Sequence, residues 1–175
     1  MPKVVVGLND LFIYIRSGDI FVRKNTGSIS GYYQPPLCFY LNILEIFKFN
    51  EVFIISENEL NPIIQKLLIK YPNIKKARND LKLDISYLIN SYNIVSGKST
   101  FFAVFIRFND KLKFLWEYDF YPSKRIYNFQ LYYTIYKMDS SNNYKKIMIP
   151  WANLPNQREI MIKEKCTNSF IIIKQ

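Results

Sequence analysis

The segment LFIYIRSGD, residues 11–19, decides the fold of this chain. Its first residues are apolar or aromatic without alternation, which is typical of a β-strand covered on both faces. Ser17, Gly18 and Asp19 then end the strand with turn-forming residues. A strand of this kind belongs inside a layered α/β structure, so the segment predicts a sheet with helices on both sides.

Strand and helix patterns alternate through residues 1–118. Short apolar runs predict strands, and apolar residues at helical spacing predict the helices between them. Pro36, Asn61, Asp80 and Ser99 stand at the expected helix starts. The strands are expected at residues 3–6, 11–16, 51–56, 93–96 and 113–116, and the helices at residues 36–47, 62–71, 81–89 and 100–108. This order predicts a Rossmann-like α/β domain with a mainly parallel sheet.

The pattern changes after residue 118. Residues 125–137, 145–149, 159–164 and 169–174 resemble strands separated by turn-rich SSNN and NLPN segments. We therefore expect two parts, a Rossmann-like domain over residues 1–118 and a β-rich carboxy-terminal appendage over residues 119–175.

Composition limits the possible functions. The 175 residues include 24 Lys and Arg against 14 Asp and Glu, a net charge of +10 that suits an anionic partner. The chain has no histidine, which excludes Ser-His-Asp triads and histidine-based zinc hydrolase motifs. Its two cysteines, Cys38 and Cys166, are expected to be buried or idle thiols. Because no secretory signal or membrane-spanning run is visible, we expect a soluble, intracellular protein.

The first candidate site is the IRSGD turn. Carboxyl ends of parallel strands meet at a crevice where ligands bind, and Arg16 there offers a planar fork of donors to a phosphate. Gly18 lets the backbone approach a ligand closely, and Asp19 could orient Arg16 or act as a base. An ordinary ion pair at a strand end explains the same residues.

Two further segments end at the same predicted edge. SGKSTF, residues 96–101, brings the hydroxyls of Ser96, Ser99 and Thr100 to a helix start, where an anion can be held. It lacks the first glycine of a nucleoside-triphosphate P-loop, and a capped turn before a core helix is the alternative. Glu57 and Asn58 follow the strand at residues 51–56 and are expected to face the same crevice if the strands are parallel, although polar residues end most strands.

A basic and aromatic tract covers residues 121–146. Its cations and rings, which could neutralise phosphates and stack bases, are Lys124, Arg125, Tyr132, Tyr133, Tyr136, Lys137, Lys145 and Lys146. No RNA-binding signature accompanies them, and alternating strand residues with solvated lysines explain the pattern better. Nucleic acid is therefore not the expected partner, although it stays an alternative.

Four segments in order resemble one family. They are IYIRSGDIF (residues 13–21), YYQPPLCFY (32–40), EVFIISENELNPI (51–63) and DISYLINSYNIVSGKSTF (84–101). Together they resemble the donor-binding half of the fucosyltransferases of the α1,2, α1,6 and protein-O-fucosyl superfamily. The match covers residues 11–116, and Tyr14 stands where the family usually has histidine.

The resemblance implies a domain like the carboxy-terminal half of a GT-B glycosyltransferase. Such a domain binds GDP-fucose without a metal or other cofactor and transfers fucose with inversion to a sugar or protein hydroxyl. Arg16 matches the family arginine that grips the donor diphosphate, Ser99 and Thr100 match hydroxyls near the phosphates, and Glu57 and Asp84 match acidic positions. Asp19 is the candidate base.

The expected function is therefore that of a fucosyltransferase-like domain, with a nucleotide sugar and a glycan or protein acceptor as partners. The first alternative is a nucleotide-sugar-binding or glycan-binding remnant without transferase activity. The second is a nucleic-acid-binding module that uses the basic and aromatic tract.

Overall fold

The computed structural model describes residues 1–22, 33–77, 80–118 and 133–174. These residues form one sheet in the order β3-β2-β1-β4-β5-β6-β7, and only the β6–β7 pair is antiparallel. The strands are β1 (Leu11–Tyr14), β2 (Val52–Ile55), β3 (Lys75–Lys76), β4 (Asn93–Val95), β5 (Phe114–Tyr118), β6 (Thr134–Met138) and β7 (Ile171–Lys174). This arrangement confirms the predicted α/β class with a mainly parallel, Rossmann-like sheet.

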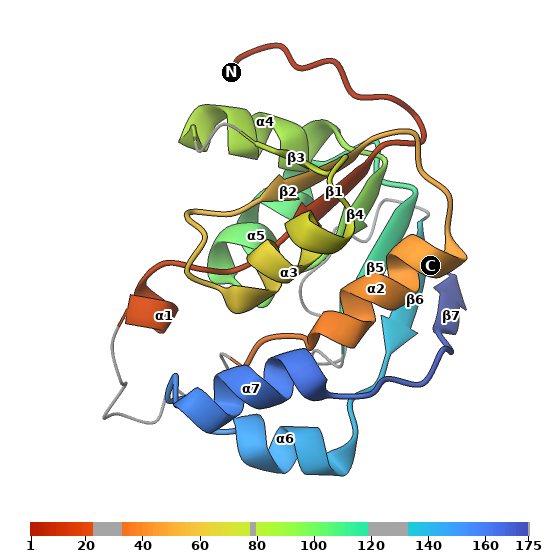
Figure 1. Cartoon of the computed structure of the whole chain (residues 1–175). Helices are drawn as coiled ribbons and strands as arrows, with labels where there is room; N and C mark the ends of the chain where they lie inside the picture. The colour runs from red at the N-terminus through yellow and green to blue at the C-terminus, as the bar shows by residue number, and fades with distance from the viewer. Residues whose placement is uncertain (23–32, 78–79, 119–132, 175) are drawn as a thin grey trace.

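Helices cover both faces of this sheet (Figure 1). They are α1 (Asp19–Val22), α2 (Leu37–Ile46), α3 (Pro62–Lys70), α4 (Leu81–Asn90), α5 (Thr100–Phe105), the 3-10 helix η1 (Ile106–Phe108), α6 (Asn142–Met148) and α7 (Pro155–Lys163). α2, α3, α6 and α7 pack on one face, and α4, α5 and η1 pack on the other. The strand order changes direction between β1 and β4, so a ligand crevice is expected at the carboxyl ends of these strands.

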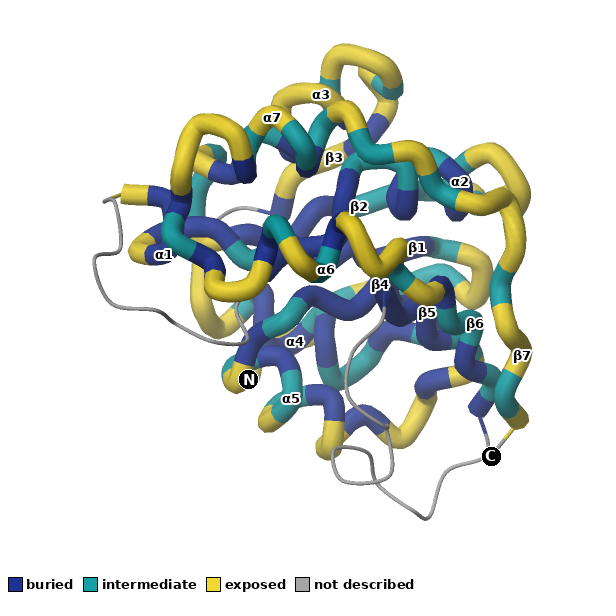
Figure 2. Tube along the Cα trace, turned by 90° about the horizontal axis from the view of Figure 1, so that it is seen from below, coloured by how far each residue is buried: buried dark blue, intermediate teal, exposed yellow. Residues whose placement is uncertain are grey.

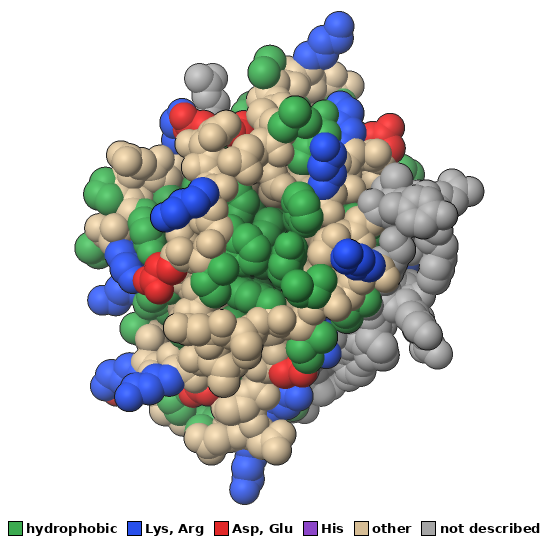
Figure 3. Space-filling model, turned by 90° about the vertical axis from the view of Figure 1, so that its right-hand side faces the viewer, with side chains coloured by type: hydrophobic (Ala, Val, Ile, Leu, Met, Phe, Trp, Pro, Cys, Tyr) green, Lys and Arg blue, Asp and Glu red, His purple; other side chains and the backbone are tan. Residues whose placement is uncertain are grey.

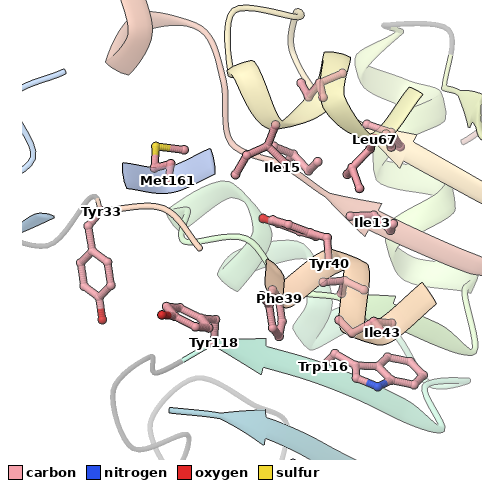
Figure 4. Close-up of a cluster of buried hydrophobic side chains, with 14 of the residues drawn as sticks. Ile13, Ile15, Tyr33, Phe39, Tyr40, Ile43, Leu67, Trp116, Tyr118 and Met161 are labelled. Atoms are coloured by element: carbon pink, nitrogen blue, oxygen red, sulfur yellow. The ribbon is translucent and has the colours of Figure 1, made fainter. Parts of the chain in front are cut away.

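The larger core lies between the sheet and the helices α2, α3, α6 and α7. Figure 4 shows Ile43 of α2 between Ile13 of β1 and Trp116 of β5, and Phe39 of the same helix beside Tyr118. In Figure 2 the buried residues follow the strands and the inner sides of the helices. Burial of β1 on both faces, with Leu11, Phe12 and Ile13 each 0% exposed, confirms the covered strand that its sequence predicts.

Polar caps fix the starts of two helices as the sequence predicts. The Asn61 side chain accepts a hydrogen bond from the Ile63 backbone N–H (3.0 Å) at the start of α3. The Asp80 carboxylate accepts from the N–H groups of Lys82 (2.8 Å) and Leu83 (3.1 Å) at the start of α4. These bonds satisfy backbone donors that have no partner inside the helix.

The predicted strand at residues 3–6 is absent from the structure, which describes all four of these residues. No strand is assigned there, and Val5 is 99% exposed. Because β2 and β4 occupy both sides of β1, the amino-terminal residues have no free position beside it.

The carboxy-terminal section is not the expected β-rich appendage. The strands predicted at residues 145–149 and 159–164 are instead parts of α6 and α7. Ser141 caps α6 by accepting from the Tyr144 N–H (3.0 Å), and Pro155 opens α7 at a position where proline favours a helix. β6 and β7 do confirm strands within residues 134–137 and 171–174, and they extend the same sheet. Residues 125–132 of the predicted strand lie outside the described part.

Cys38 and Cys166 form a disulfide, so the prediction of two buried or idle thiols was wrong. The bond joins the second residue of α2 to the segment after α7, across a sequence separation of 128 residues. α2 and α7 pack on the same face of the sheet, which brings the two Cα atoms to 5.6 Å. The number of cysteines in a sequence does not show that two of them lie this close in the fold.

We expect the loss of this disulfide to destabilise the fold. A Cys38→Ser/Cys166→Ser variant should lose about 2–4 kcal/mol of unfolding free energy, because a cross-link over a long loop restricts the unfolded chain. Urea unfolding of the variant and of the wild type, each with and without reductant, measures the change. Reductant should lower the stability of the wild type to that of the variant. Two titratable thiols in the unreduced native wild type would refute the bond.

Candidate functional site

A cavity of about 280 Å³ opens at the carboxyl end of β1, where the sequence places its main site. β1, the end of β2, α4 and α5 supply its walls. The lining residues are Tyr14, Arg16, Ser56, Glu57, Leu81, Asp84 and Phe101. Arg16, Glu57 and Asp84, which come from three separate segments and were all predicted as donor-binding residues, therefore share one cavity.

Arg16 lies in this cavity with 21% of its side chain exposed. Its Nη2 donates to Asp19 Oδ1 at 2.7 Å, and its buried Nε has no hydrogen-bond partner among the described residues. Burial alone would lower the pKa of Arg16, but the Asp19 carboxylate and the neighbouring Tyr14 raise it. A permanent positive charge with spare donors therefore faces the cavity.

The loop after β1 is bonded to the loop after β2. Asn58 Oδ1 accepts from the Ser17 hydroxyl (2.6 Å) and from the Gly18 N–H (3.1 Å). In the reverse direction, Ser17 Oγ accepts from the Asn61 N–H (3.0 Å), and the Asn61 amide donates to the Arg16 carbonyl (2.9 Å). These bonds between the two loops fix the backbone that carries Arg16. The sequence predicts Asn58 at the crevice and Asn61 at a helix start, but it does not predict that they join the two loops.

Gly18 is a glycine for two reasons. Its φ of 74° is in the left-handed region, which side chains with a Cβ rarely adopt. An added Cβ would also lie 1.9 Å from a carboxylate oxygen of Glu57. The close contact at Gly18 is therefore with Glu57, and the close approach of its backbone to a ligand stays a prediction.

Tyr14 connects the cavity to the serine-rich turn. Its hydroxyl donates to Ser99 Oγ at 3.1 Å, and its ring stacks with Phe101 and Phe102. Burial raises the pKa of Tyr14, although the Ser99 hydrogen bond and the charge of Arg16 oppose this effect. Gly97 makes the contact possible, because a Cβ there would lie 2.6 Å from the Tyr14 carbonyl oxygen. Ser99 therefore does not line the cavity, but it is hydrogen-bonded to Tyr14, which does.

Asp84 is the buried acid of the cavity. It is 8% exposed, and its buried Oδ1 has no hydrogen-bond partner within the described part. Burial and the nearby Asp80 raise the pKa of Asp84 to about 6. An unpartnered carboxyl oxygen at the wall of a cavity can accept a hydrogen bond from an O–H or N–H group of a ligand.

The other predicted site residues lie outside the cavity wall. Asp19 is paired with Arg16 but its side chain is 74% exposed, and it also accepts from the Ile20 N–H (2.9 Å). Ser96 is 1% exposed, with a hydroxyl that has no hydrogen-bond partner in the described part of the chain. Thr100 is exposed at the first position of α5.

A larger hollow of about 670 Å³ lies at the opposite end of the sheet, where the strands begin. Figure 3 views the molecule from that side, and apolar side chains gather at its centre. The rings of Phe47 and Phe49 and the ion pair between Glu51 and Lys75 belong to its walls. No predicted site residue lines this hollow.

The described part of the basic and aromatic tract contributes to packing. Tyr136 stacks on Trp116, Tyr133 is 4% exposed, and Lys137 pairs with Asp139 at 2.8 Å. Lys145 and Lys146 lie on α6. Lys124, Arg125 and Tyr132 lie outside the described residues.

Among residues 1–22, 33–77, 80–118 and 133–174, no cluster of three or more cysteine or acidic side chains could hold a metal ion. Nor does any helix in these ranges combine the length and apolar character needed to cross a membrane. Comparisons with protein-family models, with curated proteins and with solved structures found no match to this chain.

We expect the buried Asp84 to make stability depend on pH. Its pKa is about 6 in the folded protein against the usual 3.8, so the folded state binds more protons between these values. Titration of Asp84 should therefore lower the unfolding free energy as the pH rises from about 4 to about 6, by up to about 3 kcal/mol. Burial also raises the pKa of Glu117 to about 8, which adds a separate loss of stability towards pH 8. The difference between wild type and Asp84→Asn in urea unfolding from pH 3.5 to pH 8 measures the part due to Asp84.

The matched variants are Asp84→Asn and Asp80→Asn. Asp84→Asn should be more stable than the wild type at pH 8 and no more stable at pH 4. Asp80→Asn keeps a capping side chain but removes the repelling charge, so it should move the stability loss to lower pH. A wild-type profile that is flat across this range would contradict the assignment.

Proposed function

We propose that this protein binds a nucleotide sugar in the Arg16 cavity and acts as a fucosyltransferase-like domain. The observation that supports this function best is the convergence of Arg16, Glu57 and Asp84 on one cavity at the carboxyl end of β1. These residues carry the sequence resemblance to GDP-fucose-dependent enzymes. The three residues lie at the edge where Rossmann-like sheets bind ligands, and this position supports a binding site for the sugar donor.

Each wall of the cavity suits a different part of such a ligand. Arg16 is the cation of the cavity lining, so the diphosphate belongs beside it. Glu57 and Asp84 would repel phosphate and instead accept hydrogen bonds from hydroxyl or N–H groups of the sugar, ribose or base. The ring of Phe101 offers an apolar surface for a base or sugar face.

Arg16 also suits a role in transfer. When the bond between sugar and diphosphate breaks, negative charge develops on the leaving nucleotide, and a nearby guanidinium stabilises it. Asp19 remains the proposed base. Its exposed carboxylate can meet an acceptor hydroxyl that arrives from solvent and can take the proton which that hydroxyl loses. The GT-B relationship, the GDP-fucose donor and the glycan or protein acceptor are parts of this proposal.

The disulfide bears on where the protein works. The sequence alone predicts an intracellular location, which stays a prediction. Disulfides persist mainly in oxidising compartments, so the bond between Cys38 and Cys166 favours a compartment outside the reducing cytoplasm.

We expect GDP and GDP-fucose to stabilise the protein through Arg16. At a ligand concentration about 100 times the dissociation constant, the gain in unfolding free energy is about 2.7 kcal/mol, and thermal unfolding detects it. Arg16→Ala should abolish the gain, whereas Arg107→Ala, which removes an exposed arginine of η1, should keep it. Stabilisation by an oligonucleotide but not by GDP, with strong salt dependence, would support the nucleic-acid alternative instead.

We expect the charge of Asp19 to be needed for transfer but not for donor binding. The amide oxygen of Asp19→Asn can still accept the hydrogen bond from Arg16 and keep it oriented, so the variant should bind GDP-fucose with little change. It should lower fucose transfer to a glycan panel by about 100-fold or more, because an amide cannot act as the base. Asp110→Asn, which changes another exposed aspartate, is the control. If the wild type binds GDP-fucose but neither hydrolyses nor transfers it, the protein is a binding remnant and the transferase assignment fails.

A further inference from the structure

Two side chains from the carboxy-terminal section hold α1, the turn that directly follows the Arg16 loop. Trp151 Nε1 donates to the Ile20 carbonyl at 3.0 Å, and Arg158 Nη2 donates to the Phe21 carbonyl at 2.7 Å. These contacts span sequence separations of 131 and 137 residues. The Phe21 ring also packs against Trp151 at 5.3 Å and lies under the Arg158 guanidinium at 5.7 Å.

The two side chains are themselves held in place. Gln157, which is 3% exposed, accepts from the N–H groups of Ala152 (3.0 Å) and Leu154 (3.2 Å) and donates to the carbonyls of Ile147 and Pro150. These bonds fix the segment on either side of Trp151, which is 0% exposed. Arg158 Nε donates to Asn153 Oδ1 at 2.7 Å, so its guanidinium links that segment to α1.

α1 needs such support because it is only four residues long. A single helical turn is unstable by itself, since forming it orders several residues for one hydrogen bond. At the entry of α1, the Phe21 N–H donates to the Gly18 carbonyl at 2.9 Å. The hydrogen bonds to Asn58 hold the start of this loop at Ser17 and Gly18. Trp151 and Arg158 hold its other end through the carbonyls of Ile20 and Phe21.

We propose that Trp151 and Arg158 are positioning residues for the donor diphosphate. They fix α1 through its carbonyls, α1 carries Asp19, and Asp19 orients the guanidinium of Arg16. Neither residue lines the cavity, so they act on the phosphate contact and not on the part of the ligand held by Glu57 and Asp84. This inference rests on the proposed donor site.

Arg158→Met tests the inference, with Lys163→Met on the exposed side of the same helix as its control. Hydrogen exchange reports the anchoring of α1 without any ligand. The Phe21 amide should exchange at least about tenfold faster in Arg158→Met, because the turn loses its strongest outside contact. Lys163→Met should leave that rate unchanged. Trp151→Phe, which keeps an aromatic ring but removes the donor, should act in the same direction as Arg158→Met.

Calorimetric titration with GDP and with guanosine then measures the effect on the site. Compared with the wild type, Arg158→Met should bind GDP about tenfold more weakly and guanosine with the same affinity. General destabilisation of the fold would not weaken the binding of one ligand alone. Equal losses for the two ligands, or faster exchange with unchanged GDP affinity, would overturn the inference. Arg158→Lys keeps the charge, so full GDP affinity in that variant together with fast exchange would also overturn it.

If the wild type binds neither GDP nor guanosine, the proposed function fails. The exchange measurement then decides by itself whether Trp151 and Arg158 hold the Arg16 loop, and unchanged exchange in Arg158→Met would refute that role.

Discussion

The site depends on one network of hydrogen bonds between the loops that follow β1 and β2. A single oxygen, Asn58 Oδ1, accepts from the Ser17 hydroxyl, the Gly18 N–H and the Leu60 N–H. Asn61 completes this network by donating its backbone N–H to Ser17 Oγ and its side-chain amide to the Arg16 carbonyl. Both loops lie at the carboxyl ends of parallel neighbours, where a backbone without such partners would be free to move. These hydrogen bonds join the two loops, and Arg16 and Glu57, which belong to the joined loops, line the cavity.

Much of the fold could be predicted from the sequence because the central strands are covered on both faces. A long apolar run such as residues 11–15 is stable only as a strand buried on both faces. The caps at Asn61 and Asp80 mark helix starts independently of tertiary contacts. The prediction was wrong where local patterns were ambiguous. The segment around Ile160, Met161 and Ile162 resembles a short strand, but Pro155 and its packing make it helical. The disulfide also depends on how distant helices pack, which spacing along the chain does not show.

Part of the candidate site could also be predicted, because the strand order places the residues that follow each parallel strand at one edge of the sheet. Parallel strands bring their carboxyl ends together, so the order of strands and helices along the chain is enough to place Arg16, Glu57 and Asp84 at one edge. What could not be predicted is which side chains turn into the cavity. Ser96 points into packed surroundings with 1% exposure, and Ser99 is occupied by Tyr14. The position of Tyr14 beside Ser99, with Phe101 and Phe102 stacked on its ring, is a three-dimensional detail without a sequence signature.

The net charge of +10 suggested an anionic partner, but the charge by itself does not describe the site. The cavity holds one arginine beside two carboxyl groups, Glu57 and Asp84. A purely anionic ligand such as inorganic phosphate would meet Arg16 favourably and both acids unfavourably. A ligand that carries its negative charge at one end and neutral hydroxyl or N–H donors at the other fits this division of charge. This distribution of charge is the reason for proposing a nucleotide sugar as the ligand in preference to a simple anion or a nucleic-acid backbone.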